Sequence, residues 1–203
     1  FVWLLNSDTE TGEKSLEELY TQMSRHEDLG AIGPQLVYPN GELQSVGGFF
    51  PSIINVFTYL VPISFFLPKK IRQRMRSIAL FPQRIPQDGI ILDYVTGAAC
   101  LLRKKALDEV GLLAEDYFMY FEETDLCFRL KKAGWMIKAI DTEPVMHVYG
   151  GSFKTKYDAR RLTLFLESLK IFVKKNIKGF QKFIILLEIG MLGRISVLLK
   201  RLR

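Results

Sequence analysis

The chain has 203 residues and a mass of 23.4 kDa, with 48% hydrophobic and 25% charged residues. This composition excludes a disordered, collagen-like or repeat-built protein, and the length favours one main domain. Cys100 and Cys127 lie in apolar segments without a CxxC spacing. We therefore expect neither a disulfide framework nor a cysteine-built zinc site, and a reducing compartment fits best.

The net charge of +6 is unevenly distributed. Residues 153–203 carry 13 Lys and Arg against 3 Asp and Glu, whereas residues 1–152 carry 15 against 19. Such a basic tail indicates contact with an anionic surface, either phospholipid headgroups or nucleic acid phosphates. A solvated basic helix is the alternative. Nucleic acid is disfavoured because the tail has no RNP-like aromatic motif, zinc finger or helix-turn-helix signature.

The chain begins with the apolar run FVWLL, which has no basic region or cleavage site of a signal peptide. We interpret it as a buried strand cut at its start, and expect these residues to be the later part of a longer protein. A helix follows, because Ser15 and Glu18 have the spacing of a capping box and Leu19 and Met23 continue at helical spacing.

Residues 29–48 predict a short strand, a turn at Pro39-Asn40-Gly41 and a second short stretch that ends at Gly47-Gly48. Residues 49–68 contain no charge, but Pro62 interrupts them and a basic run follows. We favour a helix at a membrane interface over a spanning helix or a soluble core insertion. The cations that would contact headgroups are Lys69, Lys70, Arg72, Arg74 and Arg76.

The next elements alternate between strands and helices, which predicts an α/β fold. ILDYVTGAACLL is interpreted as a buried strand, RKKALDEVG as a helix ending at Gly111, and EETDLCFRLKKAG as a helix closed by Gly134. WMIKAID and PVMHVYGGS predict two more strands. The tail is helical over 157–176, and residues 180–203 predict a further apolar helix that is peripheral rather than transmembrane.

Two residues suggest a metal site. Asp8 follows the opening strand, where α/β proteins place ligand-binding groups, and could hold a hard divalent cation. Helix capping or a turn would also explain an acid there. His147 follows a later strand and could ligate the same metal, although a lone histidine at a strand end is more often structural.

Three acids, Glu122, Glu123 and Asp125, crowd a predicted helix start behind an aromatic run. The helix dipole accounts for one or two of them, and Asp125 with Arg129 forms an ordinary i,i+4 pair. Like charges and aromatic surface can also raise proton affinity, as a general base requires. The small residues of Thr96–Ala99 permit close approach of a ligand or of another strand.

Taken in order, these segments resemble the family 2 glycosyltransferases, specifically rhamnosyltransferase-like members. The matching segments are LLNSDTE, IGPQLVYPNGELQSVGG, the region from DYVTGAACLL to FRLKKAGW, and VMHVYGGS. The resemblance implies the C-terminal part of a GT-A (Rossmann-like) fold over 1–152, with an insertion at 49–84 and a helical basic tail at 153–203. It also implies that the N-terminal nucleotide-binding half is missing.

The resemblance further implies inverting transfer of a sugar from a nucleotide-diphosphate donor to a hydroxyl acceptor, a glycan or lipid-linked molecule of bacterial surface polysaccharide synthesis. Asn6 and Asp8 occupy the place of the DxD motif, with Asp8 and His147 as ligands of Mg²⁺ or Mn²⁺. Glu123 is the candidate base, with Glu122 and Asp125 as neighbours. The residues expected to bind the substrates are Asn6, Asp8, Thr96, Gly97 and Ala98. We expect the protein in the cytoplasm, peripheral on the inner face of the plasma membrane.

Two other functions remain open from the sequence. One is a noncatalytic module that binds a membrane surface or nucleic acid through the basic tail. The other is a metal-dependent hydrolase that uses Asp8, Asp125 and His147, which are suitable ligand types without a recognisable spacing.

Overall fold

The computed structural model describes residues 1–61, 68, 77–80, 82–148 and 159–201. The chain divides into two compact units. The first, here called the α/β unit, consists of Phe1–Phe50, Ala79–Leu113 and Glu123–Tyr149. The second, the helical unit, consists of Pro51–Ile78, Ala114–Glu122 and Gly150–Arg203.

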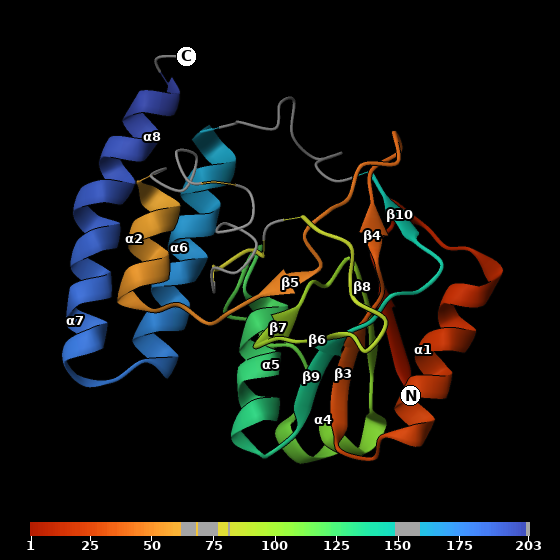
Figure 1. Cartoon of the computed structure of the whole chain (residues 1–203). Coiled ribbons are helices and arrows are strands. Elements are labelled where there is room, and N and C mark those ends of the chain that lie inside the picture. Colours follow the sequence, from red (N-terminus) through yellow and green to blue (C-terminus); the bar gives the residue numbers. More distant parts are fainter. Residues whose placement is uncertain (62–67, 69–76, 81, 149–158, 202–203) are drawn as a thin grey trace. The chain divides into compact units, whose positions relative to one another are not determined.

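A five-stranded mixed sheet forms the centre of the α/β unit (Figure 1), in the order β1-β8-β3-β9-β6. Strand β8 pairs antiparallel with both β1 and β3, β3 pairs parallel with β9, and β9 pairs antiparallel with β6. The bounds are Val2–Leu5 for β1, Leu29–Gly33 for β3, Ile90–Ile91 for β6, Ala99–Leu102 for β8 and Met136–Ala139 for β9.

Two smaller sheets complete the strands of this unit. In the first, β10 (Val145–His147) lies between β2 (Thr9–Glu10) and β4 (Leu36–Val37). The second pairs β5 (Gly47–Gly48) with β7 (Tyr94–Val95). The predicted turn at 39–41 is present, because the Tyr38 N–H bonds the Glu42 carbonyl across it. The β2–β10 pairing places the segment that follows β1 beside the last residue of β10, His147.

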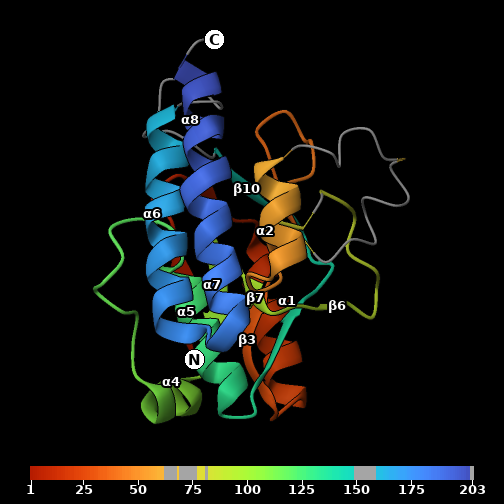
Figure 2. The same cartoon turned by 90° about the vertical axis from the view of Figure 1, so that its left-hand side faces the viewer.

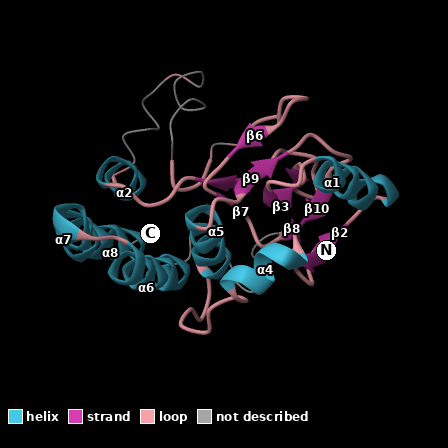
Figure 3. Ribbon diagram, turned by 90° about the horizontal axis from the view of Figure 1, so that it is seen from below, coloured by secondary structure: helices cyan, strands magenta, loops and turns pink. Residues whose placement is uncertain are grey.

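Helices cover both faces of the central sheet (Figure 3): α1 lies on one face, and α4 and α5 lie on the other. Leu19 and Met23 of α1 are fully buried against Ile32 and Leu101, and Leu126 and Leu130 of α5 enter the main core. The bounds are Glu13–Arg25 for α1, Lys104–Val110 for α4 and Glu122–Lys132 for α5. The predicted mixed α/β architecture is confirmed.

Three local predictions for this unit were wrong. The opening strand is not buried, because β1 is an edge strand that pairs, among the described residues, with β8 alone and leaves Val2 and Leu5 exposed. The segment 91–102 is not one strand but parts of three, since β6, β7 and β8 belong to separate pairings.

The third error concerns the capping box predicted at Ser15 and Glu18. Helix α1 begins earlier, at Glu13, and Gly12 at its N-cap position makes no side-chain cap. Ser15 Oγ donates to the Glu143 carbonyl over 2.9 Å, while Glu18 Oε2 accepts from the Glu143 N–H over 2.8 Å. The Glu143 carboxylate in turn accepts from the Lys14 N–H. A distant loop therefore satisfies this helix start, which no local pattern could reveal.

The helical unit contains α2, α6, α7 and α8, which run alongside one another (Figure 2). A π-helical segment, η2, joins α7 to α8, so the two form one interrupted rod. Fully buried Leu169, Phe172 and Ile185 form the core of this unit. The bounds are Ile53–Leu60 for α2, Ala159–Asn176 for α6, Gly179–Glu188 for α7, Ile189–Gly193 for η2 and Arg194–Arg201 for α8.

Part of the segment 49–68, predicted as an interfacial helix, is helical in the structure. Ile53–Leu60 is helical and begins at a capping box formed by Ser52 and Asn55. Residues 62–67 and the basic residues at 69–76 lie outside the described part of the chain. Among the described helices, none combines the length and the apolar composition that a bilayer crossing requires.

Candidate active site

The first part of the site is the turn that follows β1. The Asn6 N–H bonds the Ala98 carbonyl over 3.0 Å and so extends the β1–β8 ladder by one residue. Thr9 then closes the turn, because both its N–H and its hydroxyl donate to the Asn6 carbonyl. The Val148 N–H bonds the Asp8 carbonyl. The backbone at both Asn6 and Asp8 is thus held by strands from distant parts of the chain.

This turn places Asp8 against His147, as the sequence predicts for a shared site. His147 lies opposite Thr9 in the β2–β10 pairing and is 5% exposed. Its Nε2 lies 3.3 Å from Asp8 Oδ1 and 3.5 Å from Asn6 Nδ2. The Asp8 side chain keeps 32% of its surface exposed. The imidazole is therefore buried at the back of the site, whereas the carboxylate reaches solvent.

Gln44 determines which nitrogen of His147 carries the proton. The Gln44 amide nitrogen donates to the carbonyls of Val37 and His147. Its Oε1 is therefore the acceptor that faces His147 Nδ1 at 3.1 Å, so Nδ1 bears the hydrogen. Burial lowers the pKa of His147, against the opposing attraction of the Asp8 charge. In the neutral ring, Nε2 presents a lone pair toward Asp8 and Asn6.

The segment Thr96–Ala98 connects this polar pair with the acidic helix start. It runs from β7 to β8, and the Thr96 N–H bonds the Val46 carbonyl over 3.1 Å. Ala98 holds Asn6 through its carbonyl, and its N–H lies 3.4 Å from Thr96 Oγ1. Gly97 faces helix α5: a methyl group added there would lie 3.7 Å from Glu123 Cβ. One short segment therefore bonds Asn6 through Ala98 and lies next to Glu123 at Gly97.

Glu123 lies in the first turn of α5 and is partly exposed. Its charge adds to the effect of burial on two thiols of the core. Burial is the main cause that raises the pKa of Cys127 to about 12, and the Glu123 carboxylate raises it further. The pKa of Cys100 is raised well above its usual value by the same causes, with a contribution from Cys127. These buried thiols therefore stay protonated.

The two residues before α5 adopt an uncommon backbone conformation. Tyr120 and Phe121 have φ values of 68° and 69°, in the left-handed region that bulky residues rarely occupy. Within the helical unit, Phe121 is buried, and its ring lies 5.3 Å from Phe165 and 5.5 Å from Phe172. This packing offsets the cost of the strained turn. Strain of this kind is often found at functional sites.

The other two acids have different surroundings. Glu122 is half-buried, and its Oε2 has no hydrogen-bond partner in the part of the chain that the structure describes; burial raises the pKa of Glu122. Asp125 is fully buried and forms the predicted pair with Arg129 at 2.9 Å. Arg129 also donates to the carbonyls of Val110, Gly111 and Leu112 after α4. The Asp125–Arg129 pair therefore ties two helices of the α/β unit together.

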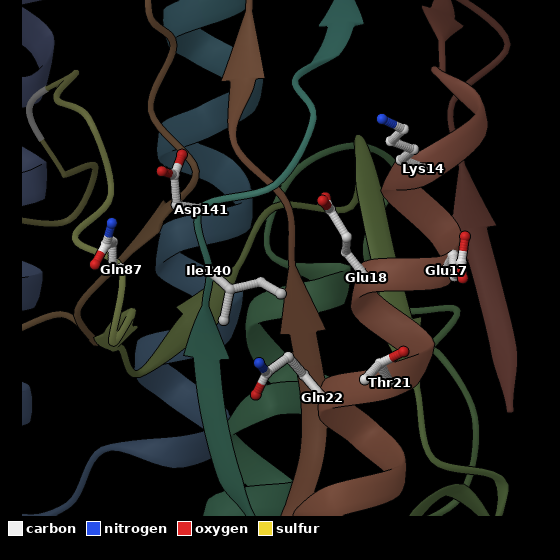
Figure 4. Close-up of a pocket in the computed structure, with 8 residues that line it drawn as sticks. All are labelled: Lys14, Glu17, Glu18, Thr21, Gln22, Gln87, Ile140 and Asp141. Carbon is white, nitrogen blue, oxygen red and sulfur yellow. The ribbon is translucent and has the colours of Figure 1, made fainter.

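The described residues do not form the ligand set of the hydrolase hypothesis. Asp125 is engaged with Arg129, and no group of three or more His, Cys, Asp or Glu side chains gathers to hold a metal within the described ranges. A pocket of about 450 Å³ lies elsewhere, between α1 and the chain after β9 (Figure 4). Its charged residues are Lys14, Glu17, Glu18 and Asp141, and none of the predicted site residues lines it.

Gln44 is the site residue that sequence reasoning missed. It is almost fully buried and has one side-chain bond to each of three groups. Its position in ELQSVGG gives no local signal, since a glutamine after a turn is usually solvated. Only the pairing of β4 with β10 brings it to His147.

Comparisons with known proteins identify relatives of one enzymatic class. An N-acetylglucosaminyl-diphospho-decaprenol L-rhamnosyltransferase of Mycobacterium tuberculosis is 31% identical over 147 residues, which cover 72% of this chain and 46% of the relative. A low-salt glycan biosynthesis hexosyltransferase of Haloferax volcanii is 24% identical over 182 residues, covering 85% of this chain and 52% of the relative. The chain is a relative of glycosyltransferases. This confirms the resemblance found in the sequence.

The chain spans about half the length of the curated relatives it matches. No family model matches the chain.

Proposed function

We propose that this chain contributes the catalytic part of an inverting glycosyltransferase, which moves a sugar from a nucleotide-diphosphate donor to a hydroxyl group of a lipid-linked glycan in bacterial cell-surface polysaccharide synthesis. The relatives support the class and, by their names, a lipid-linked or glycan acceptor. The observation that carries the proposal is the Thr96–Ala98 segment, which bonds Asn6 through the Ala98 carbonyl and lies next to Glu123 at Gly97. The arrangement supports a GT-A type of fold for the α/β unit.

Asp8 and His147 are the residues that we propose as ligands of Mg²⁺ or Mn²⁺. In the neutral state, His147 Nε2 and Asp8 Oδ1 are two lone-pair donors only 3.3 Å apart. Two ligands each about 2.1 Å from an octahedral ion lie about 3.0 Å apart, so this pair fits neighbouring positions on one cation. Gln44 fixes the tautomer that frees Nε2, a role that outer partners of histidine ligands commonly have. When bound, the ion would offset charge on the departing diphosphate.

Glu123 is the proposed general base. Its carboxylate would take the proton from the acceptor hydroxyl while that oxygen forms a bond to the anomeric carbon and the bond from this carbon to the diphosphate oxygen breaks. One carboxylate is sufficient, because the leaving diphosphate needs no protonation, in contrast to glycoside hydrolysis. Asp125 would hold the start of α5 through Arg129, and Glu122 would tune the acidity of the same helix start.

Thr96, Gly97 and Ala98 are proposed to line the place where donor sugar and acceptor meet, with Asn6 beside the donor. Gly97 lies next to Glu123, since a methyl group added there would be in ordinary contact with Glu123 Cβ. We also propose that the protein works in the cytoplasm, peripheral on the inner face of the plasma membrane, where the basic residues of 153–203 would favour anionic lipids. A purely noncatalytic membrane module would not require the Asn6–Asp8–His147 arrangement.

Substitution of Glu123→Gln in the full-length gene product tests this function. We expect sugar transfer to fall by about 10²- to 10⁴-fold, the usual contribution of a general base, with donor binding unchanged. Exposed Glu27 provides the matched control, and Glu27→Gln should keep full activity. Transfer rates would be measured with a panel of nucleotide sugars by mass spectrometry, and donor affinity by calorimetry. Wild-type turnover by Glu123→Gln would remove this residue from the mechanism.

A further inference from the structure

The α7–η2–α8 rod carries large apolar side chains on the side that faces away from the core of the helical unit. Each is between 47% and 75% exposed. We call them the outer stripe, and they are Phe180, Phe183, Leu187, Met191, Ile195 and Leu198. Isolated exposed apolar residues are common on protein surfaces, but a contiguous apolar row marks an interaction site.

Helical geometry makes these residues one row. They follow one another in steps of three or four, the spacing of neighbours on a single helix face. The opposite face is buried, because Ile185, Ile189 and Gly193 pack into the unit. Gly193 permits especially close packing, since a methyl group there would lie 3.0 Å from Leu166 Cδ1.

The π-helical segment lies in the middle of the row. Three successive steps of four residues join Phe183 to Ile195, and in a helix with 3.6 residues per turn such steps drift around the axis. The wider turn of η2, with its i→i+5 pattern, holds more residues per turn and offsets that drift. The buried residues Ile185, Ile189 and Gly193 follow the same steps of four, so η2 keeps the buried and the exposed side of the rod in line together.

Within the described part of the chain, one side of the rod packs against α2 and α6 while the outer stripe stays exposed. The ionic groups of the rod distinguish between possible occupants. Residues 179–201 contain a single acid, Glu188, against four cations: Lys182, Arg194, Lys200 and Arg201. A second copy of the same rod would repel these cations, whereas an anionic bilayer attracts them.

We propose that the outer stripe is a membrane-docking face, on which the rod lies parallel to an anionic phospholipid surface with its apolar row in the headgroup–acyl boundary. Interfacial helices bury an apolar face in this way while cations contact the headgroups. The purpose of such docking rests on the proposed function, because it would bring the enzyme to a lipid-linked acceptor. The binding itself can be measured without any sugar transfer, so the two proposals can fail separately.

The test is co-flotation of the full chain with vesicles of phosphatidylcholine containing 30% phosphatidylglycerol. We expect the wild-type chain to float at low salt, and a Phe183→Gln, Met191→Gln double variant to lose at least ten-fold in vesicle affinity. The matched control is Leu112→Gln with Phe118→Gln, two apolar side chains of similar or greater exposure off the rod, which should bind like the wild type. Circular dichroism would show that both double variants keep their helices.

Insertion depth provides a second measurement. A Met191→Cys variant labelled with an environment-sensitive fluorophore should shift its emission to the blue on vesicles, and a labelled Leu112→Cys variant should not. Both native cysteines are buried, so the label reaches the introduced residue.

Three results would overturn the proposal. The first is no flotation of the wild type. The second is flotation that high salt abolishes and the glutamine double variant retains, which would assign binding to charge alone. The third is a wild-type dimer in solution that the glutamine double variant converts to a monomer, with equal vesicle binding by both.

Discussion

The two units of this chain are stabilised in different ways. In the α/β unit, polar side chains from distant segments hold one another: Gln44 holds His147, Arg129 holds Asp125 and three carbonyls, and Glu143 caps α1. In the helical unit, aromatic and aliphatic contacts such as Phe121–Phe172 form the core, and the apolar outer stripe remains exposed. The difference indicates that specific polar contacts fix the geometry of the α/β unit, whereas burial of apolar surface stabilises the helical unit. Substitutions can test this contrast.

The largest effect on stability is expected from Arg129→Met. The substitution leaves the fully buried Asp125 without this ion pair and removes the bonds to the carbonyls after α4. Removing one partner of a buried pair costs about 3–5 kcal/mol, and we expect the lower end because Arg129 is partly exposed. The exposed i,i+4 pair Lys104–Asp108 is the control, and Lys104→Met should cost less than about 0.5 kcal/mol. Urea denaturation followed by circular dichroism would measure both, and equal losses would contradict the contrast.

The next effect is expected at Gly47, which lies opposite Val95 in the β5–β7 pairing, next to the Thr96–Ala98 segment. A methyl group there would lie 2.2 Å from the Tyr94 carbonyl oxygen and 2.9 Å from Val95 Cα, both backbone atoms. We expect Gly47→Ala to lower the free energy of unfolding by about 2–3 kcal/mol, as overpacking does. Gly41 has φ of 79° but open space around it, so Gly41→Ala should cost about 1 kcal/mol. Thermal denaturation should rank the two variants in this order.

The third effect concerns metal binding. We expect His147→Gln to weaken binding of Mn²⁺ in the presence of a nucleoside diphosphate by about 10- to 100-fold, and Gln44→Ala to weaken it in the same direction by a smaller factor. The exposed histidine, His26, is the control, and His26→Gln should bind Mn²⁺ normally. Calorimetry and the electron paramagnetic resonance signal of free Mn²⁺ measure this directly. Equal affinity for all variants would place the cation elsewhere.

The smallest effect is a pH dependence from Glu122. Burial raises its folded-state pKa above the unfolded value, so the folded chain holds this proton more tightly. This group therefore contributes stability below its unfolded pKa, and the contribution is lost as the pH rises through the folded pKa. Glu122→Gln should remove that part of the pH dependence and make the chain slightly more stable at pH 7. Denaturation curves of wild type and variant between pH 4 and pH 7 should converge at the acidic end.

Much of the fold could be predicted because its signals are local. The helix ends at Gly111 and Gly134, the turn at 39–41 and the helices of the tail all follow from residue spacing and from glycines with positive φ. The resemblance to glycosyltransferases also came from the sequence, since short motifs keep their order whatever the loops between them do. The Asp125–Arg129 pair was predictable for the same reason, because i,i+4 neighbours meet on any helix.

What remained hidden depends on pairings between distant segments. Ser15 and Glu18 have capping-box spacing, yet they bind the backbone of Glu143, because the loop after β9 lies over the start of α1. The apolar run of β1 predicts burial, but its single neighbour in the sheet leaves it half exposed. Gln44 carries no signal at all until β4 meets β10.

By itself, the sequence determined where the helices and turns lie, which class of fold they build and which family they resemble, because these depend on propensity, periodicity and motif order over a few residues. Only the tertiary structure decided that Asp8 lies 3.3 Å from His147, that Gly97 faces Glu123 and that the rod turns an apolar row outward. Strand register and helix packing set these contacts, and both arise from the simultaneous burial of segments that are far apart in the chain.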